Sequence, residues 1–139
     1  MKILIIDDNR SVAEKMSKII TDFLIGAEVT VCSMSYSPDQ SPRLRIPDID
    51  TVQRLIESHD LILIDHNLGQ IEFDGSILAR FCQKNGKFHI GISSHSSFCK
   101  TNFMAKHELD IHPAFVEAFE NILADTIAEM KKIQLSKIR

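Results

Sequence analysis

Three carboxylates in two short runs of the chain could do chemistry together. Asp7 and Asp8 follow the apolar run 3–6, and Asp65 follows the apolar run 61–64. A continuous Ile/Leu run bounded by polar residues is typical of a strand buried on both faces of a parallel sheet. Ligands of open α/β sheets bind outside the carboxyl ends of the strands, so we expect these side chains to emerge at one edge. Because like charges at short range raise one another's pKa values, such a pocket favours a divalent metal ion.

The composition indicates one globular domain and excludes several classes of protein. The chain has 139 residues, of which 44% are hydrophobic, and a net charge of −3, so it can form a sizeable core. The basic residues are scattered except at the C-terminus, which argues against a nucleic-acid surface, and no apolar run is long enough to cross a membrane. Residues 1–6 lack the order of a signal peptide, and the cysteines lack a CxxC spacing. We therefore expect a cytoplasmic protein with reduced thiols.

Strand and helix patterns alternate along the chain and predict a (βα)₅ fold, a doubly wound five-stranded parallel sheet. The expected strands are residues 2–7, 28–33, 61–65, 88–93 and a very short one at 109–111. The expected helices are residues 10–25, a short helix capped by Asp48 or Asp50, a helix from Asp74 to about Asn85, a weak helix at 97–107 and a long helix from about 113 to 137.

Two segments depart from this rhythm. Residues 34–47 hold three of the four prolines, and they are long for a connection between a strand and a helix. We interpret them as a surface insertion, with a partner-docking loop as the alternative. The final helix, 113–137, is longer than one sheet face requires. Its end could pair with a second copy to form a homodimer, or it could be a solvated end whose cations suit a helix C-terminus.

Taken together, the motifs resemble those of the receiver domains of two-component response regulators, over the whole chain apart from residues 34–47. In that family an acidic pair follows the first strand and the phosphoacceptor aspartate ends the third. A Leu or Met comes three residues after the acceptor, an acidic-Gly pair opens the third helix, and a Ser or Thr ends the fourth strand. The matching residues here are Asp7, Asp8, Asp65, Leu68, Asp74, Gly75 and Ser93.

The resemblance implies a phosphoacceptor in a phosphorelay. Asp65 would take a phosphoryl group from a histidine kinase or a His-phosphotransfer protein, and the Ser93 hydroxyl would contact a phosphoryl oxygen. Mg²⁺, or alternatively Mn²⁺, would be the cofactor. The implied metal ligands are the carboxylates of Asp8 and Asp65, the backbone carbonyl of Asn67, and Asp7 either directly or through water. Apart from its own phosphorylation and dephosphorylation, no enzymatic activity is expected.

The sequence also departs from the family pattern near its end. Receivers normally carry a Lys-Pro pair after the fifth strand, and the aligned pair here is His112-Pro113. We expect His112 to take the place of the lysine, with a pH-dependent output, because an unperturbed histidine titrates near neutral pH. Lys106 is expected to lie on the wrong side of the fifth strand. Leu109 aligns with the aromatic residue that many receivers place in that strand.

Two classes of function remain open. The first is a phosphoacceptor switch, which we expect to act through a downstream protein partner and not through a DNA-binding or catalytic output domain. The second is a degenerate receiver that acts as a phosphorylation-independent protein-binding module. The acidic residues and Ser93 favour the first class, whereas His112 and Leu109 favour the second. A metal-dependent phosphatase is a distant third interpretation.

Overall fold

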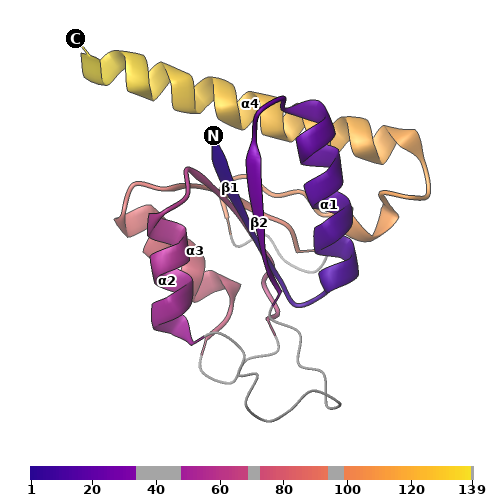
Figure 1. The fold of residues 1–139 in the computed structure, drawn as a ribbon, viewed down its shortest axis with the longest axis horizontal. Helices are drawn as coiled ribbons and strands as arrows, with labels where there is room; N and C mark the ends of the chain where they lie inside the picture. Colours follow the sequence, from indigo (N-terminus) through magenta and orange to yellow (C-terminus); the bar gives the residue numbers. More distant parts are fainter. Residues whose placement is uncertain (34–47, 69–72, 94–98, 139) are drawn as a thin grey trace.

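The computed structural model describes residues 1–33, 48–68, 73–93 and 99–138. Within them, four parallel strands form one sheet in the order β2-β1-β3-β4 (Figure 1). The strands are β1 (Lys2–Asp7), β2 (Glu28–Ser33), β3 (Leu61–Ile64) and β4 (Phe88–Gly91). In the register, Ile3 of β1 lies beside Val29 on one side and Leu61 on the other. No helix in the described part of the chain is long and apolar enough to cross a membrane.

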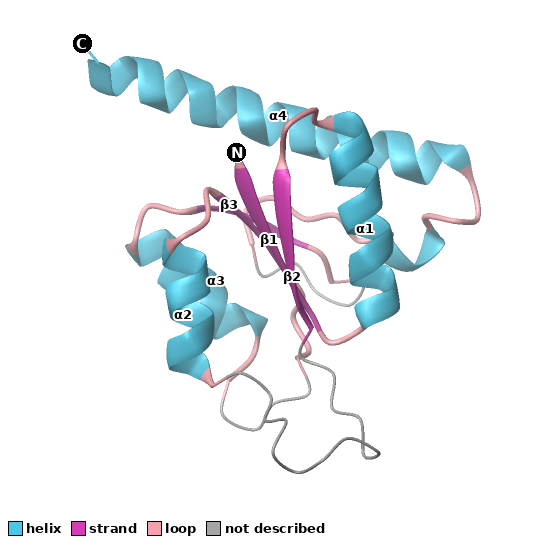
Figure 2. Ribbon diagram, in the orientation of Figure 1, coloured by secondary structure: helices cyan, strands magenta, loops and turns pink. Residues whose placement is uncertain are grey.

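Helices lie on both sides of this sheet (Figure 2). They are α1 (Arg10–Phe23), α2 (Ile49–Glu57), α3 (Gly75–Lys84) and α4 (Pro113–Ile138), with a 3₁₀ helix, η1 (Lys106–Glu108), before the last. The first three helices begin at a side chain whose oxygen accepts a hydrogen bond from a backbone N–H, which stabilises a helix N-terminus. These capping residues are Asn9, Asp48 and Asp74.

The core is divided by the sheet into two apolar clusters. The first lies between the sheet and helices α1 and α4, and the second lies between the sheet and helices α2 and α3. Leu61 and Leu63 of β3 face the first cluster, while Ile62 and Ile64 face the second. Burial on both faces explains why β3 is a continuous apolar run instead of an alternating one.

The expected fifth strand at residues 109–111 is wrong. These residues form a turn after η1, in which Leu109 is buried and Ile111 is exposed. The place beside β4 is taken by a single bridge between Gly91 and Asn102. The Gly91 N–H donates to the Thr101 carbonyl over 2.8 Å, and the Gly91 carbonyl accepts from the Phe103 N–H over 2.7 Å. An alternation of three residues is too short to predict a strand when another segment, here the one around Asn102, can pair with β4 instead.

Gly91 lies closely against the side chain of Asn102. An ideal Cβ on Gly91 would lie 2.2 Å from Oδ1 of Asn102, so any other residue would require the Asn102 side chain to turn away. The weak helix expected at 97–107 is also wrong, because residues 99–105 are not helical and only η1 overlaps the expected range. The insertion 34–47 lies outside the described residues.

Candidate functional site

The three carboxylates converge at the edge where β1 and β3 end. Asp7 is the last residue of β1, Asp8 follows it, and Asp65 follows β3, which is the parallel neighbour of β1. One carboxylate oxygen from each residue lies within 4.8 Å of the others. Asp7 and Asp65 are buried, with exposed fractions of 0% and 5%, while Asp8 is half-buried. The convergence that the strand-end pattern predicts is therefore present.

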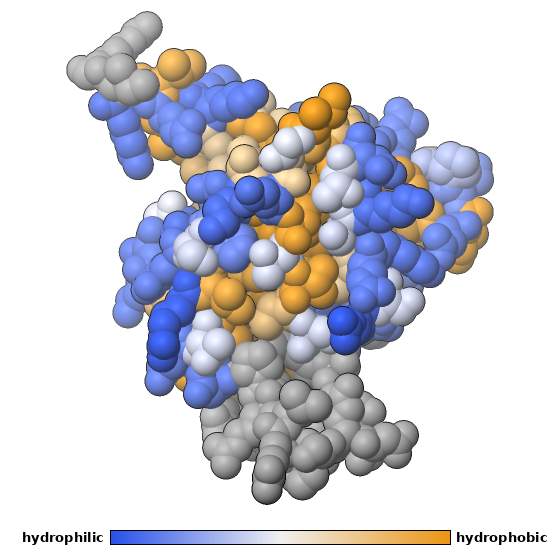
Figure 3. All heavy atoms as spheres, in the orientation of Figure 1, coloured by the Kyte–Doolittle hydropathy of each residue, from blue (hydrophilic) through white to orange (hydrophobic). Residues whose placement is uncertain are grey.

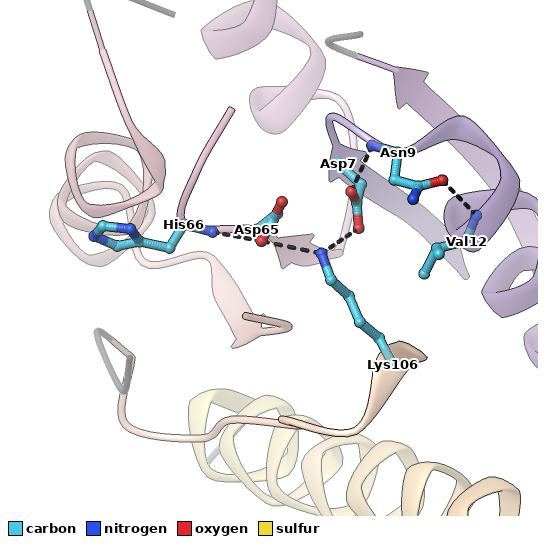
Figure 4. Close-up of polar contacts among 6 residues, drawn as sticks. All are labelled: Asp7, Asn9, Val12, Asp65, His66 and Lys106. Carbon is cyan, nitrogen blue, oxygen red and sulfur yellow. Dashed lines mark hydrogen bonds and ion pairs between the residues drawn. The ribbon is translucent and has the colours of Figure 1, made fainter. Parts of the chain in front are cut away.

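A lysine completes the cluster. The ammonium group of Lys106 donates to Oδ2 of Asp7 over 2.9 Å and lies 3.0 Å from Oδ1 of Asp65 (Figure 4). Its side chain is buried, as are the two carboxylates it contacts. The expectation that Lys106 lies on the wrong side of the fifth strand is wrong. The chain runs beside β4 at Asn102 and not at 109–111. Lys106 therefore follows the segment that lies beside β4, and it lies at the end of the sheet where the strands finish.

His112 is placed elsewhere by the same change in the path of the chain. It is an exposed residue directly before α4, and its Nδ1 accepts a hydrogen bond from the Ala114 N–H over 3.0 Å. The sequence held a signal for the alternative. Phe103 precedes Lys106 by three residues, the same spacing that separates Leu109 from His112.

Backbone N–H groups hold the two buried carboxylates in position. The Asn9 N–H donates to Oδ1 of Asp7 over 2.8 Å, and the His66 N–H donates to Oδ1 of Asp65 over 2.9 Å. Oδ1 of Asp65 thus faces two donors, one from the backbone and one from Lys106. Two donors on one oxygen fix the orientation of the carboxylate, and hydrogen bonds to a charged acceptor are stronger than neutral ones.

The start of α3 supports the backbone that carries Asp65. The Gly75 N–H donates to the His66 carbonyl over 2.8 Å. An ideal Cβ on Gly75 would lie 2.1 Å from the carbonyl oxygen of Asp65 and 2.7 Å from Cα of His66. Only glycine allows this approach, so the helix and the Asp65 loop pack backbone against backbone.

The electrostatics of the cluster show an excess of negative charge. Burial is the largest cause that raises the pKa of Asp65 to about 7, and the neighbouring Asp8 and Asp7 raise it further, while Lys106 opposes them. Burial also raises the pKa of Asp7 against the effect of Lys106. Three carboxylates facing one ammonium group favour an additional cation. An all-oxygen donor set of this size fits Mg²⁺, and this is the cluster that the sequence predicts for that ion.

Comparison with known proteins identifies the fold of the chain. The sequence matches no family model and no curated protein sequence. The structure is similar to the signal receiver domain of a DNA-binding response regulator (merR) from Colwellia psychrerythraea, with a TM-score of 0.53 and 14% identity over 79% of this chain and 95% of that one. The fold is that of a response regulator receiver domain.

Two further solved structures are similar to this chain over most of its length. The N-terminal domain of a response regulator/sensory box/GGDEF protein from Carboxydothermus hydrogenoformans matches with a TM-score of 0.53 and 17% identity, over 91% of this chain and 99% of that domain. NtrX from Brucella abortus matches with a TM-score of 0.57 and 16% identity, over 98% of this chain and 30% of that protein. Over the residues that the structure describes, this receiver fold has four strands in place of the expected five.

The other residues expected in a receiver site follow the same strand ends. Ser93 is buried, with an exposed fraction of 2%. It follows Ile92, whose N–H donates to the Ile64 carbonyl over 2.9 Å, so Ser93 comes at the edge where β3 ends. Asn67 is exposed, two residues after Asp65. The path of the chain therefore brings both residues to the end of the sheet that holds the carboxylates.

Magnesium is expected to stabilise this receiver fold more at about pH 8 than at about pH 5.5. The pKa of Asp65 in the folded protein, about 7, exceeds the ordinary value of 3.8. The stability that this proton contributes is therefore fully present below about pH 4 and is lost as the pH rises through about 7. A cation competes with that proton, so its stabilising effect grows over the same range. Thermal denaturation with and without MgCl₂ across this range measures the effect.

The control for this prediction is Asp65→Asn, which removes the titrating group. The variant should flatten the pH dependence of the metal-free protein between about pH 5 and about pH 8. A magnesium effect of equal size at both ends of the range would contradict the prediction.

Proposed function

We propose that the protein is a phosphoacceptor receiver, in which Mg²⁺-dependent phosphorylation of Asp65 switches a protein-binding surface. The observation that carries the proposal is the convergence of three carboxylates and the buried Lys106 ammonium at one edge of a receiver fold. A histidine kinase or a His-phosphotransfer protein in the cytoplasm supplies the phosphoryl group. A downstream protein reads the switch.

The acceptor chemistry follows from the surroundings of Asp65. A carboxylate oxygen of Asp65 attacks phosphorus, the bond from phosphorus to the donor nitrogen breaks, and an aspartyl phosphate forms. The Lys106 ammonium already lies 3.0 Å from Oδ1 of Asp65. It can therefore form an ion pair with a phosphoryl oxygen once the phosphoryl group is attached to Asp65. The Ser93 hydroxyl takes another phosphoryl oxygen. Lys106 therefore has the role that the sequence assigned to His112.

Mg²⁺ would be held by the carboxylates of Asp7, Asp8 and Asp65 with the backbone carbonyl of Asn67. When bound, the magnesium ion neutralises negative charge on the phosphoryl group as it meets the acceptor. The three carboxylate oxygens lie within 4.8 Å of one another, which supports a single ion shared by all of them. Asn9 contributes by holding Asp7 through its backbone N–H.

The switch itself runs through the segment that carries Lys106. Phe103, three residues before Lys106, packs its ring against Phe119 of α4 with 4.9 Å between the ring centroids. A phosphoryl group at Asp65 draws Lys106 away from its present contacts with the carboxylates. This movement shifts residues 103–106 and, through Phe103, the position of α4. A small displacement at the site is thereby amplified at a packed helix. Phe103 thus supplies the aromatic residue that the sequence pattern placed at Leu109.

The test is incubation with magnesium and acetyl phosphate, followed by intact mass measurement. We expect a phosphoryl mass increment that needs magnesium and is lost in Asp65→Asn. Beryllofluoride should shift amide resonances at Ser93, along 99–106 and in α4. Asp22→Asn is the matched control, because Asp22 is an exposed acid at the far end of α1.

Two other results separate the candidate functions. A mass increment without shifts beyond Asp65 would mean that the acceptor works but is not coupled to α4. No increment, with magnesium still bound, would support the phosphorylation-independent binding module. The reduction of the fifth strand to one bridge favours that second function, because the element that carries Lys106 is then weakly held to the sheet.

A further inference from the structure

The last helix has an outward face that its own domain does not use. The side of α4 that packs on the core carries Phe119, Leu123, Ile127 and Met130. Roughly a third of a turn around the helix, Ala124, Ala128 and Leu135 are exposed, Leu135 to 65%. Figure 1 shows the C-terminal turns of α4 projecting beyond the rest of the domain. Beyond Met130, none of the described side chains of α4 is buried.

Charges along α4 are separated by sign. Every charged residue of α4 up to Met130 is acidic, and every one after it is basic. The acids are Glu117, Glu120, Asp125 and Glu129, and the bases up to Ile138 are Lys131, Lys132 and Lys137. Apart from Glu120, which is half-buried, all are exposed. In Figure 3, hydrophilic side chains gather on the projecting part of the helix around a few hydrophobic ones.

We propose that this face of α4 binds the same face of a second copy of the chain, in antiparallel orientation. An antiparallel pair places the basic end of each helix beside the acidic stretch of the other, which a parallel pair does not do. Small residues at a helix contact allow the two axes to approach to about 8 Å. Ala124 and Ala128 therefore form the centre of the contact about a two-fold axis.

The register follows from the charged residues that flank the alanines. At 3.6 residues per turn, Lys132 and Asp125 lie on one flank of the alanine row, and Lys131 and Glu120 lie on the other. In an antiparallel helix pair the same flanks of the two helices meet. With the alanines at the centre, Lys132 comes within reach of Asp125 in the second copy, and Lys131 comes within reach of Glu120. Flanking charges of this kind set partner choice and orientation in helix pairs.

The rest of the molecule does not obstruct the contact. The alanine row lies roughly a third of a turn around α4 from the buried row that contains Phe119 and Leu123. The buried row packs on its own domain, so the alanine row stays accessible to the second copy. The carboxylate cluster is held by residues of β1, β3 and η1, so the interface does not require the phosphoacceptor function.

Sedimentation equilibrium at low salt tests the proposal with two charge-reversed variants. Lys131→Glu with Lys132→Glu extends the acidic stretch of α4 to residue 132, and Glu120→Lys with Asp125→Lys makes its middle basic. The dimer dissociation constant of each variant alone should be at least about tenfold higher than that of the natural chain, because four attractive contacts become repulsive. An equimolar mixture of the two should recover a dimer. Lys18→Glu with Lys84→Glu, on exposed positions of α1 and α3, is the matched control and should dimerise normally.

Three results would overturn the proposal. The first is a natural chain that stays monomeric at about 100 μM, where a contact with a micromolar Kd is saturated. The second is a dimer that either charge-reversed variant leaves intact. The third is a mixture of the two variants that remains monomeric. Circular dichroism of each variant establishes that α4 is folded, so that loss of a dimer is not loss of the helix.

Discussion

Replacing Lys106 with methionine is expected to destabilise the magnesium-free protein by about 3 kcal/mol near neutral pH. The substitution keeps the volume of the side chain and removes the ammonium group that contacts Asp7 and Asp65. Removing one partner of a buried ion pair leaves an uncompensated buried charge, which costs on the order of 3–5 kcal/mol. Chemical denaturation monitored by circular dichroism measures the change in the free energy of unfolding.

The pH dependence of this loss is set by the carboxylates. Lys106 lowers the pKa of both Asp7 and Asp65 against the stronger effect of burial. Without it both values rise, so the variant should lose least at low pH, where the carboxylates take up protons, and most above about pH 7. Added magnesium should recover part of the loss, because the ion replaces the missing positive charge.

His112→Ala is the comparison that separates the two candidate cations. His112 is exposed, and its ring accepts one hydrogen bond from the backbone at the start of α4. Its loss should cost no more than about 1 kcal/mol, the usual value of a capping contact. It should also leave the mass increment and the beryllofluoride-induced shifts unchanged, while Lys106→Met weakens the shifts in α4. The opposite ranking of the two variants would return the role to His112.

Gly75→Ala is expected to destabilise the protein by about 2–4 kcal/mol and to disturb the acceptor loop. The added Cβ would stand 2.1 Å from the Asp65 carbonyl oxygen and 2.7 Å from Cα of His66. Both are backbone atoms of a buried strand end, so neither can turn aside as a flexible side chain does, and overpacking of this kind costs ~1–3 kcal/mol or more. The free energy of unfolding and the rate of Asp65 phosphorylation should both fall.

Gly26→Ala is the matched control for steric overlap. Gly26 has a φ of 85°, and a Cβ placed there meets no atom within 4 Å. Alanine at this position should cost only about 1 kcal/mol, because of its backbone conformation, and should not change phosphorylation. If both variants lost stability equally and kept full acceptor activity, the close approach of α3 to Asp65 would not contribute to phosphorylation.

The carboxylates and the layers of the fold could be predicted because their signals are long and physically strong. Residues 3–6 and 61–64 are continuous apolar runs, which only a strand covered on both faces accommodates well. The acids directly after them must then meet at one edge, as Asp7 and Asp65 do. The capping residue Asp74 and the glycine after it marked the start of α3 in the same way.

The end of the chain could not be predicted in the same manner, because its path depends on contacts between distant residues. Nothing local distinguishes 109–111 from a short strand. The residue that lies beside β4 is Asn102, which forms a bridge with Gly91. Pro113 favoured the alignment that places His112 at the site, since His112-Pro113 resembles a Lys-Pro pair. In the structure Pro113 is simply the first residue of α4, a position that proline favours.

Core packing holds α4 from Phe119 to Met130, and the helix continues beyond that contact as a projecting arm. Phe119, Leu123, Ile127 and Met130 are buried, and α4 runs on to Ile138, about 12 Å further at ~1.5 Å per residue. When the packed part of the helix tilts at its contact with Phe103, the last turn moves furthest because it lies furthest from that contact. A spectroscopic label on the final turn of α4 is therefore a more sensitive reporter of events at Lys106 than a label placed next to the carboxylates.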